Sequence, residues 1–313
     1  MNENLGVKGL LGPVVHDPRS YESTGLWEEP TLQTAPFLRW AGGKRWLLNH
    51  LSLLQPNSYV RYFEPFLGSG ALLLSVPPEV QRFGSDSNSE LINAFVAVRD
   101  CPEQVIQKIA AFGDQKSDYL ALRESYNSDD FELNNDPSWR AAVFIYLNRT
   151  SFNGLYRVNQ LGKFNVPWGN LKKPLEKIPA HIRGTSKNLN SGKSPHQMTR
   201  FEVSDYKSVL AQASDGDWVF LDPPYAPLSP TSDFVGYTTS GFTDTDQREL
   251  RDLALDSARR GAKVMISNSD TELTRRLYRD APFRIREFLV SRRIGASASS
   301  RSPVKELIVT TYG

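Results

Sequence analysis

Residues 60–70 of the chain read VRYFEPFLGSG, and this stretch decides the fold. Its first half is rich in β-branched and aromatic residues, which predicts a strand. Gly68 and Gly70 then allow the backbone to turn tightly and to approach a ligand closely. We expect a helix to begin at Ala71. A second strand is predicted over residues 82–86, and it ends in the acidic side chain of Asp86.

The same alternation of strands and helices continues outward from this stretch. Helical patterns are predicted at 88–111 with a break near Cys101, and at 119–125, 138–147, 244–260 and 271–278, whereas short strands are predicted at 218–221, 262–267, 285–291 and 306–311. Alternating strands and helices predict an α/β fold with a doubly wound, Rossmann-like sheet.

An interruption of this alternation predicts a second domain. Residues 148–190 are rich in Gly, Pro, Asn and Lys and read as a loop and hairpin insertion. We expect residues 36–92 and 200–313 to form the catalytic domain. Residues 93–199 would form a mainly helical recognition domain with a hairpin at about 151–169. Residues 1–35 have no sustained period and read as an N-terminal extension without fixed structure.

The charge of the chain is unevenly distributed along its length. The formal net charge over 313 residues is only +2. Residues 148–200 nevertheless contain ten basic residues and one acidic residue, and residues 274–305 contain nine basic and two acidic ones. Two basic clusters on an acidic body are typical of a polyanion binder, although a solvated basic face is the simpler alternative.

Composition excludes several classes of protein. No run of about 18 apolar residues is present, so we expect no membrane-spanning helix. A single cysteine, Cys101, excludes an internal disulfide, and four scattered histidines lack metal-ligand spacing, so no metal site is predicted. We expect a reduced, cytoplasmic protein.

Three segments have the residue types of a ligand or catalytic site. Asp86 follows Gly68 by 18 residues and can accept hydrogen bonds from ribose hydroxyls, but Leu73 stands where a dinucleotide fingerprint has its third glycine. This pattern favours a nucleoside ligand without a pyrophosphate.

The second segment is the tetrapeptide Asp222-Pro223-Pro224-Tyr225 at the end of a buried strand. Its prolines stiffen a loop that presents a carboxylate, a backbone carbonyl and an aromatic ring. An exocyclic amine on a flat base needs two acceptors and a ring for stacking. A turn capped by Asp222 is the structural alternative.

The third segment is residues 40–44, WAGGK, ahead of a predicted helix. We interpret its two glycines as a cradle in which backbone N–H groups bind a carboxylate. Lys44 lacks the spacing of a phosphate-binding loop.

Together these segments resemble the Dam-type family of AdoMet-dependent DNA adenine-N6 methyltransferases. The resemblance extends from about Pro36 to Tyr312. The matching pieces, in order, are residues 37–44 (FLRWAGGK), 64–70 (EPFLGSG), 147–149 (LNR), 152–155 (FNGL), 163–167 (KFNVP), 222–228 (DPPYAPL), 266–268 (ISN) and 304–307 (VKEL).

The resemblance implies S-adenosylmethionine (AdoMet) as the methyl donor and double-stranded DNA as the substrate. The residues implied to bind AdoMet are Trp40, Lys44, Phe66, Gly68, Gly70, Asp86 and Asp222. Asp222 and the Pro223 carbonyl would bind the adenine N6 amine, and Pro224 and Tyr225 complete the catalytic loop. Tyr225 would stack on a base that is flipped out of the duplex, because N6 is paired inside it.

The resemblance also implies that the hairpin reads DNA in the major groove at GATC. Arg157 and Arg39 would each contact a guanine, and Leu155 and Pro167 would contact thymine methyl groups. Phe152 and Asn153 would fill the base stack near the extruded adenine. Arg292 and Arg293 would contact phosphates, which position the protein without reading sequence.

Two departures from the family bear on sequence preference: Arg39 stands where close members have Lys, and Phe152 stands where some have Tyr. The alternatives are methylation of a different short target, methylation of cytosine N4, a catalytically silent DNA-binding protein and a nicotinamide oxidoreductase. Asp222 disfavours cytosine N4 methylation, and the intact loops disfavour a silent protein. Leu73 disfavours the oxidoreductase. We expect a monomer, and a solitary or a restriction-linked role stays open.

Overall fold

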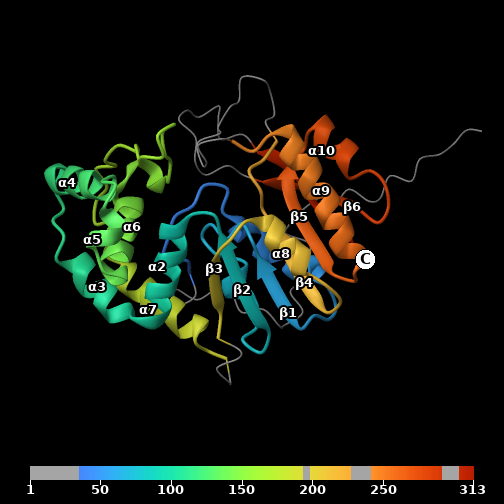
Figure 1. The fold of residues 1–313 in the computed structure, drawn as a ribbon, viewed down its shortest axis with the longest axis horizontal. Coiled ribbons are helices and arrows are strands. Elements are labelled where there is room, and N and C mark those ends of the chain that lie inside the picture. The colour runs from blue at the N-terminus through green and yellow to red at the C-terminus, as the bar shows by residue number, and fades with distance from the viewer. Residues whose placement is uncertain (1–34, 193–197, 227–240, 291–302) are drawn as a thin grey trace, which may run out of the picture.

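A computed structural model describes residues 35–192, 198–226, 241–290 and 303–313 (Figure 1). The strands are β1 (Arg61–Glu64), β2 (Gln81–Asp86), β3 (Arg200–Val203), β4 (Asp217–Leu221), β5 (Lys263–Ser269), β6 (Arg284–Val290) and β7 (Val304–Thr310). The α-helices are α1 (Leu51–Leu54), α2 (Ser89–Asp100), α3 (Pro102–Ala110), α4 (Lys116–Tyr126), α5 (Phe131–Asn134), α6 (Pro137–Thr150), α7 (Ile178–Leu189), α8 (Tyr206–Gln212), α9 (Asp244–Arg259) and α10 (Glu272–Leu277). Short 3₁₀ segments are η1 (Lys44–His50), η2 (Leu73–Ser75) and η3 (Phe152–Gly154).

The strands form one seven-stranded sheet in the order β3-β2-β1-β4-β5-β7-β6. The first five strands in this order, β3, β2, β1, β4 and β5, are mutually parallel. Strand β7 runs antiparallel to both of its neighbours, β5 and β6. The chain winds outward from β1 in both directions, so the carboxyl ends of β1, β2 and β4 meet at one edge. Ligands of open α/β sheets bind at that edge.

Both faces of the sheet are buried. Trp218 and Phe220 of β4 belong to a hydrophobic cluster that includes residues of α1, α2, α6 and α7. Val219 and Leu221 of the same strand point the other way, into a cluster with α8, α9 and α10. Because successive side chains of a strand alternate between faces, a continuous apolar run indicates helices on both sides. The predicted doubly wound α/β sheet is confirmed.

Helices α2 to α7 gather on one side of the sheet (Figure 1). A third cluster joins these helices to residues 164–166 of the predicted hairpin, and its buried members are Tyr119, Phe131, Val143, Tyr146, Leu147, Phe164 and Val166. Antiparallel bridges pair Ser151 with Trp168 and Val158 with Phe164. The division of the chain into two domains stays a prediction, and α2 spans its proposed boundary at residues 92 and 93.

Two sequence predictions about elements are wrong. The helix expected from Ala71 is only the single 3₁₀ turn η2, because Pro77 forces Val76 into an extended conformation and leaves too few residues for a helix. Residues 148–190, expected as loop and hairpin, include the helix α7. Its buried Ile178, Ile182 and Leu189 follow a helical spacing that the surrounding Gly, Pro and Lys residues obscured.

Within the described segments, none of the helices is both long enough and apolar enough to cross a bilayer. The predicted extension 1–35 falls, except for Ala35, outside the described residues.

Candidate active site and nucleic-acid interface

Asp86 and the glycine turn meet at the carboxyl edge of the sheet. The Asp86 carboxylate accepts hydrogen bonds from the backbone N–H of Gly68 at 3.4 Å and of Asn88 at 3.1 Å. Burial raises the pKa of Asp86 to about 6, against the opposing effect of the backbone N–H bonds. The group is therefore largely ionised at neutral pH and can accept further hydrogen bonds from ligand hydroxyls.

Gly68 is required by the close approach of Trp40. The residue has φ +48°, and a Cβ atom built on it would lie 2.8 Å from Trp40 Cδ1. Trp40 also stacks on Tyr156, with ring centroids 5.3 Å apart and an angle of 12° between the planes. Trp40 therefore fills the space between the glycine turn and the start of the hairpin.

Gly70 and Phe66 flank the same turn. Gly70 has φ +64°, and a Cβ atom there would come 3.0 Å from the Phe95 ring. The half-buried Phe66 ring stacks on Tyr206, at a centroid distance of 5.3 Å. Both residues that were predicted to bind the cofactor thus lie on the loop at the carboxyl end of β1.

Lys44 binds the loop Asp222–Tyr225, which was predicted to be the catalytic loop. Its ammonium group lies 2.8 Å from Asp222 Oδ1, and the lysine side chain is only 4% exposed. The same nitrogen lies 4.7 Å from the centroid of the Tyr225 ring. The hydroxyl of Ser267 on β5 also donates to Asp222 Oδ1, at 2.5 Å. Lys44 therefore contacts both ends of the Asp222–Tyr225 loop.

The glycine pair beside Lys44 closes a turn. The backbone N–H of Gly43 donates to Trp40 O at 3.2 Å. The binding of a ligand carboxylate by this glycine pair stays a prediction.

Two buried side-chain amides, Gln247 and Asn268, hydrogen-bond to each other and to the backbone of the loop. Gln247 Nε2 donates to the Pro224 carbonyl at 2.8 Å, and Asn268 Nδ2 donates to Gln247 Oε1 at 3.0 Å. Asn268 Oδ1 accepts from the backbone N–H of Ala226 at 3.1 Å. Gln247 thus occupies the carbonyl of Pro224, and none of the described residues donates a hydrogen bond to the carbonyl of the preceding residue, Pro223.

Tyr225 is oriented by an acidic residue on the last strand. Its hydroxyl donates to Glu306 Oε2 at 2.8 Å. Sequence reasoning assigned no role to Glu306, Gln247 or Ser267. Glu306 and Ser267 lie in the family-like segments 304–307 and 266–268, and this was the one indication in the sequence that they could have a role.

A second buried acid lies on β1. Glu64 is 4% exposed, and the hydroxyl of Tyr62 donates to Glu64 Oε2 at 2.7 Å. Burial, assisted by the negative charge of Asp222, raises the pKa of Glu64 to about 8. The group therefore carries a proton at neutral pH, beside the ion pair of Lys44 and Asp222.

The predicted DNA-reading residues of the hairpin are exposed, except for the half-buried Leu155, which packs against the third cluster. The backbone N–H of Phe152 donates to Pro167 O at 2.8 Å, and the Phe152 ring is 49% exposed. Asn153 follows with φ +56° and is exposed. Leu155 is half-buried, and Arg157 is exposed with its Nε donating to Asn165 at 2.8 Å.

Arg39 comes from a distant part of the chain and joins this group through Asn148. The backbone N–H of Arg39 donates to Asn148 Oδ1 at 2.9 Å, and Asn148 Nδ2 donates back to Arg39 O at 2.8 Å. Its aliphatic stem lies against Gly154. Arg292 and Arg293 lie outside the described residues.

A basic groove extends the same surface. A cavity of about 310 Å³ is lined by Arg39, Arg149, Leu171, Lys172, Lys173, Pro174, Glu176 and Lys177. Five cations against one carboxylate make this groove complementary to a polyanion. Among the described residues, no group of three or more His, Cys, Asp or Glu side chains is placed to hold a metal ion.

Comparison with known proteins identifies the family of this chain. Residues 40–292 match the family model of the D12 class N6 adenine-specific DNA methyltransferases. The type II methyltransferase M1.LlaDCHI of Lactococcus lactis subsp. cremoris is 39% identical over 297 residues, covering 92% of this chain and 99% of the relative. The DNA adenine methylases of Vibrio cholerae and Escherichia coli K12 are 35% and 34% identical, and each match covers 87% of this chain and 94% or 93% of the relative.

The match extends over the glycine turn, the catalytic loop and the hairpin, at nearly full length in both partners. The chain therefore belongs to the D12 class of N6 adenine-specific DNA methyltransferases.

Proposed function

We propose that this enzyme transfers the methyl group of AdoMet to N6 of an adenine extruded from duplex DNA, with GATC as its target. One observation carries the proposal: the short segment from Trp40 to Lys44 contacts both halves of the site. Trp40 packs on the turn beside Asp86, and Lys44 binds Asp222. A donor and an acceptor of a methyl group need such a shared scaffold, because transfer depends on their alignment.

The residues at the end of β2 suit AdoMet. An ionised carboxylate at Asp86 suits two ribose hydroxyls, and the turn at Gly68 and Gly70 brings the backbone close to a ligand. Only the 3₁₀ turn η2 follows the glycines, and this suits a ligand without a pyrophosphate, because pyrophosphate sites use the N-terminus of an α-helix at that place. When bound, AdoMet supplies a methyl group on a positively charged sulfonium. Trp40, Lys44 and Phe66 would complete the walls of its site.

The catalytic loop would make the adenine amine nucleophilic. Asp222 and the Pro223 carbonyl would accept the two N6 hydrogens, which turns the nitrogen lone pair away from the ring. Gln247 and Asn268 fix the loop in place, so the acceptors need no reorganisation during transfer. Tyr225, held by Glu306, would stack on the base.

The hairpin would open and read the duplex. Adenine N6 is paired inside the helix, so the base must leave the stack, and Phe152 with Asn153 would take its place. Arg157 and Arg39 would read guanines through their acceptor atoms, whereas Leu155 and Pro167 would contact thymine methyl groups. The basic groove beside Arg39 would hold the backbone phosphates. A monomer acting on DNA in the cytoplasm stays a prediction.

A transfer assay tests the proposal. Purified protein is incubated with labelled AdoMet and with two duplexes that differ only in one GATC sequence. We expect label at adenine N6 in the GATC duplex alone. Labelling of both duplexes to the same extent would refute the target sequence, and labelling of neither would refute the reaction.

A further inference from the structure

We propose that Asn127, at the end of α4, is a positioning residue that sets the register of the DNA-reading hairpin and thereby the enzyme's discrimination between target sequences. The inference rests on the proposed function, in which the hairpin reads DNA. None of the sequence motifs includes Asn127, and it touches neither the glycine turn nor the catalytic loop in the described structure.

The side chain of Asn127 imitates a neighbouring β-strand. Its Oδ1 accepts from the backbone N–H of Phe164 at 2.7 Å, and its Nδ2 donates to the Phe164 carbonyl at 2.9 Å. One planar amide thus satisfies both backbone groups of a single residue. Such a pair fixes that residue's position along the strand, because a neighbour shifted by one residue presents its N–H and C=O to the opposite side.

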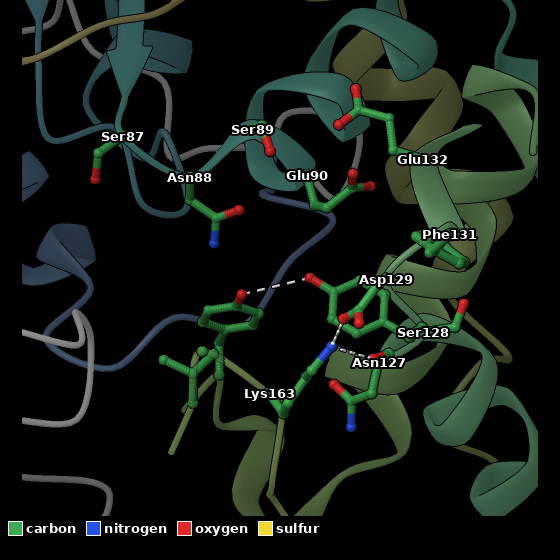
Figure 2. A pocket seen from close by; sticks show the side chains of 14 residues that line it. Ser87, Asn88, Ser89, Glu90, Asn127, Ser128, Asp129, Phe131, Glu132 and Lys163 are labelled. Carbon is green, nitrogen blue, oxygen red and sulfur yellow. Dashed lines mark hydrogen bonds and ion pairs between the residues drawn. The ribbon is translucent and has the colours of Figure 1, made fainter. Parts of the chain in front are cut away.

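Neighbouring contacts hold the same strand at two further points. Lys163 Nζ donates to the backbone carbonyl of Asn127 at 2.6 Å and forms an ion pair with Asp129. The hydroxyl of Tyr119 donates to Val166 O at 2.7 Å. Figure 2 shows the Lys163 side chain reaching the loop that carries Asn127, Ser128 and Asp129. The end of α4 and the loop after it therefore act as a template for residues 163–166.

The register decides which side chains face outward. Phe164 and Val166 are buried in the cluster with Tyr119, whereas Asn165 is half-buried and Pro167 is exposed. A slip of one residue would exchange the two sets, because side chains of an extended strand alternate. Pro167 would then turn inward, away from the proposed DNA contact.

The register also reaches Arg157. Asn165 follows Phe164 directly, and its Oδ1 accepts from Arg157 Nε at 2.8 Å. Its backbone N–H donates to Arg157 O at 3.1 Å. The Asn127 amide therefore binds Phe164, and the adjacent residue Asn165 binds Arg157, the arginine proposed to read a guanine.

Packing alone does not hold this strand on its open side. A cavity of about 430 Å³ lies beside it, and Asn127, Glu90, Tyr156 and Lys163 are among its lining residues (Figure 2). Close packing specifies position in a protein core. Where a cavity lies beside the segment instead of packed side chains, the hydrogen bonds of Asn127 have a larger part in fixing its position.

The test compares Asn127→Ala with Asn190→Ala. Asn190 is a matched control: it also caps the C-terminus of a helix, α7, and its side chain also donates to a distant carbonyl, that of Arg99 at 2.7 Å. For each protein, kcat/KM is measured on a GATC duplex and on a duplex with the guanine–cytosine pair read by Arg157 exchanged. AdoMet affinity and urea unfolding are measured in parallel.

We expect Asn127→Ala to lower the ratio of the two kcat/KM values about tenfold, as the loss of two hydrogen bonds to the strand would allow. AdoMet affinity should remain unchanged, and Asn190→Ala should keep the wild-type ratio. A purely structural role would lower both kcat/KM values equally and leave the ratio unaffected, which would overturn the inference.

Asn127→Asp provides a second variant of the same shape in case Asn127→Ala does not fold. It keeps the acceptor for the Phe164 N–H but places a carboxylate oxygen against the Phe164 carbonyl oxygen, which repels it, so the ratio should fall at least as far as in Asn127→Ala. A wild-type ratio in this variant would likewise contradict the inference. Wild-type protein that shows no preference between the duplexes would instead refute the proposed target recognition, before any variant is compared.

Discussion

The substitution Gly68→Ala tests whether the turn and Trp40 are as closely fitted as the structure shows. Gly68 has φ +48°, and its new Cβ atom would lie 2.8 Å from Trp40 Cδ1. A left-handed backbone costs about 1–2 kcal/mol for alanine. Displacing a packed ring adds roughly 1–3 kcal/mol. We therefore expect the free energy of unfolding to fall by about 2–5 kcal/mol.

Gly216→Ala separates these two contributions. Gly216 has φ +82°, but its new Cβ atom would meet only Val60 Cγ2, at 3.8 Å, an ordinary contact. It lies just before β4, at the opposite edge of the sheet from the proposed cofactor site. This variant should lose only the backbone contribution, about 1–2 kcal/mol.

Urea unfolding and calorimetric titration with AdoMet measure both consequences. Gly68→Ala should bind AdoMet at least about tenfold more weakly, because Trp40 must move out of the site, whereas Gly216→Ala should bind like the wild type. Equal stability loss in the two variants, together with unchanged AdoMet affinity in Gly68→Ala, would refute the close fit and the place of Trp40 in the cofactor site.

Four further predictions follow from the site. Asp222→Asn should slow single-turnover methyl transfer at least about 100-fold while DNA affinity by fluorescence anisotropy stays within about twofold; transfer at the wild-type rate would show that the carboxylate does not hold the amine. AdoMet affinity should fall as the pH drops through about 6, because the pKa of Asp86 lies there and only the ionised carboxylate accepts hydrogen bonds from both ribose hydroxyls. In titrations from pH 5 to 8, Asp86→Asn should bind AdoMet weakly and without this pH dependence. Burial raises the pKa of Glu64 to about 8 from 4.5, so the native state keeps a proton that the unfolded chain has released. Stability should therefore fall as the pH rises through this window, and urea unfolding of Glu64→Gln should lack that component; an identical slope in both proteins would contradict the burial. Arg157→Ala should relax discrimination at one guanine by roughly 1–3 kcal/mol in competition between duplexes, and an unchanged preference would remove Arg157 from the reading surface.

Most of the sheet could be predicted from local sequence. Parallel strands buried on both faces are short apolar runs, and residues 218–221 and 262–267 are such runs. Prediction failed where a local rule was overridden nearby. The apolar residues from Ala71 onward suggested a helix, but the prolines at 77 and 78 end the segment after one turn. In α7 a buried helical stripe was obscured by residues typical of loops.

The site could be predicted in part for a topological reason. Once the chain is read as a doubly wound sheet, residues at the carboxyl ends of β1, β2 and β4 must share one edge. Gly68, Asp86 and Asp222 were placed in this way. The partners that hold the Asp222–Tyr225 loop could not be placed, because Lys44, Gln247 and Glu306 come from elements whose separation along the chain follows no repeating pattern.

The sequence by itself determined the class of chain, most strands of its sheet, and the residue types at its reactive edge. These properties depend on local periodicity, turn chemistry and short motifs, which act over a few neighbouring residues. Only the tertiary structure decided that Lys44 binds Asp222, that Gln247 occupies the carbonyl of Pro224, and that Asn127 pairs with Phe164. Each of these is a hydrogen bond or ion pair between distant segments, and its geometry exists only after the sheet and helices have packed.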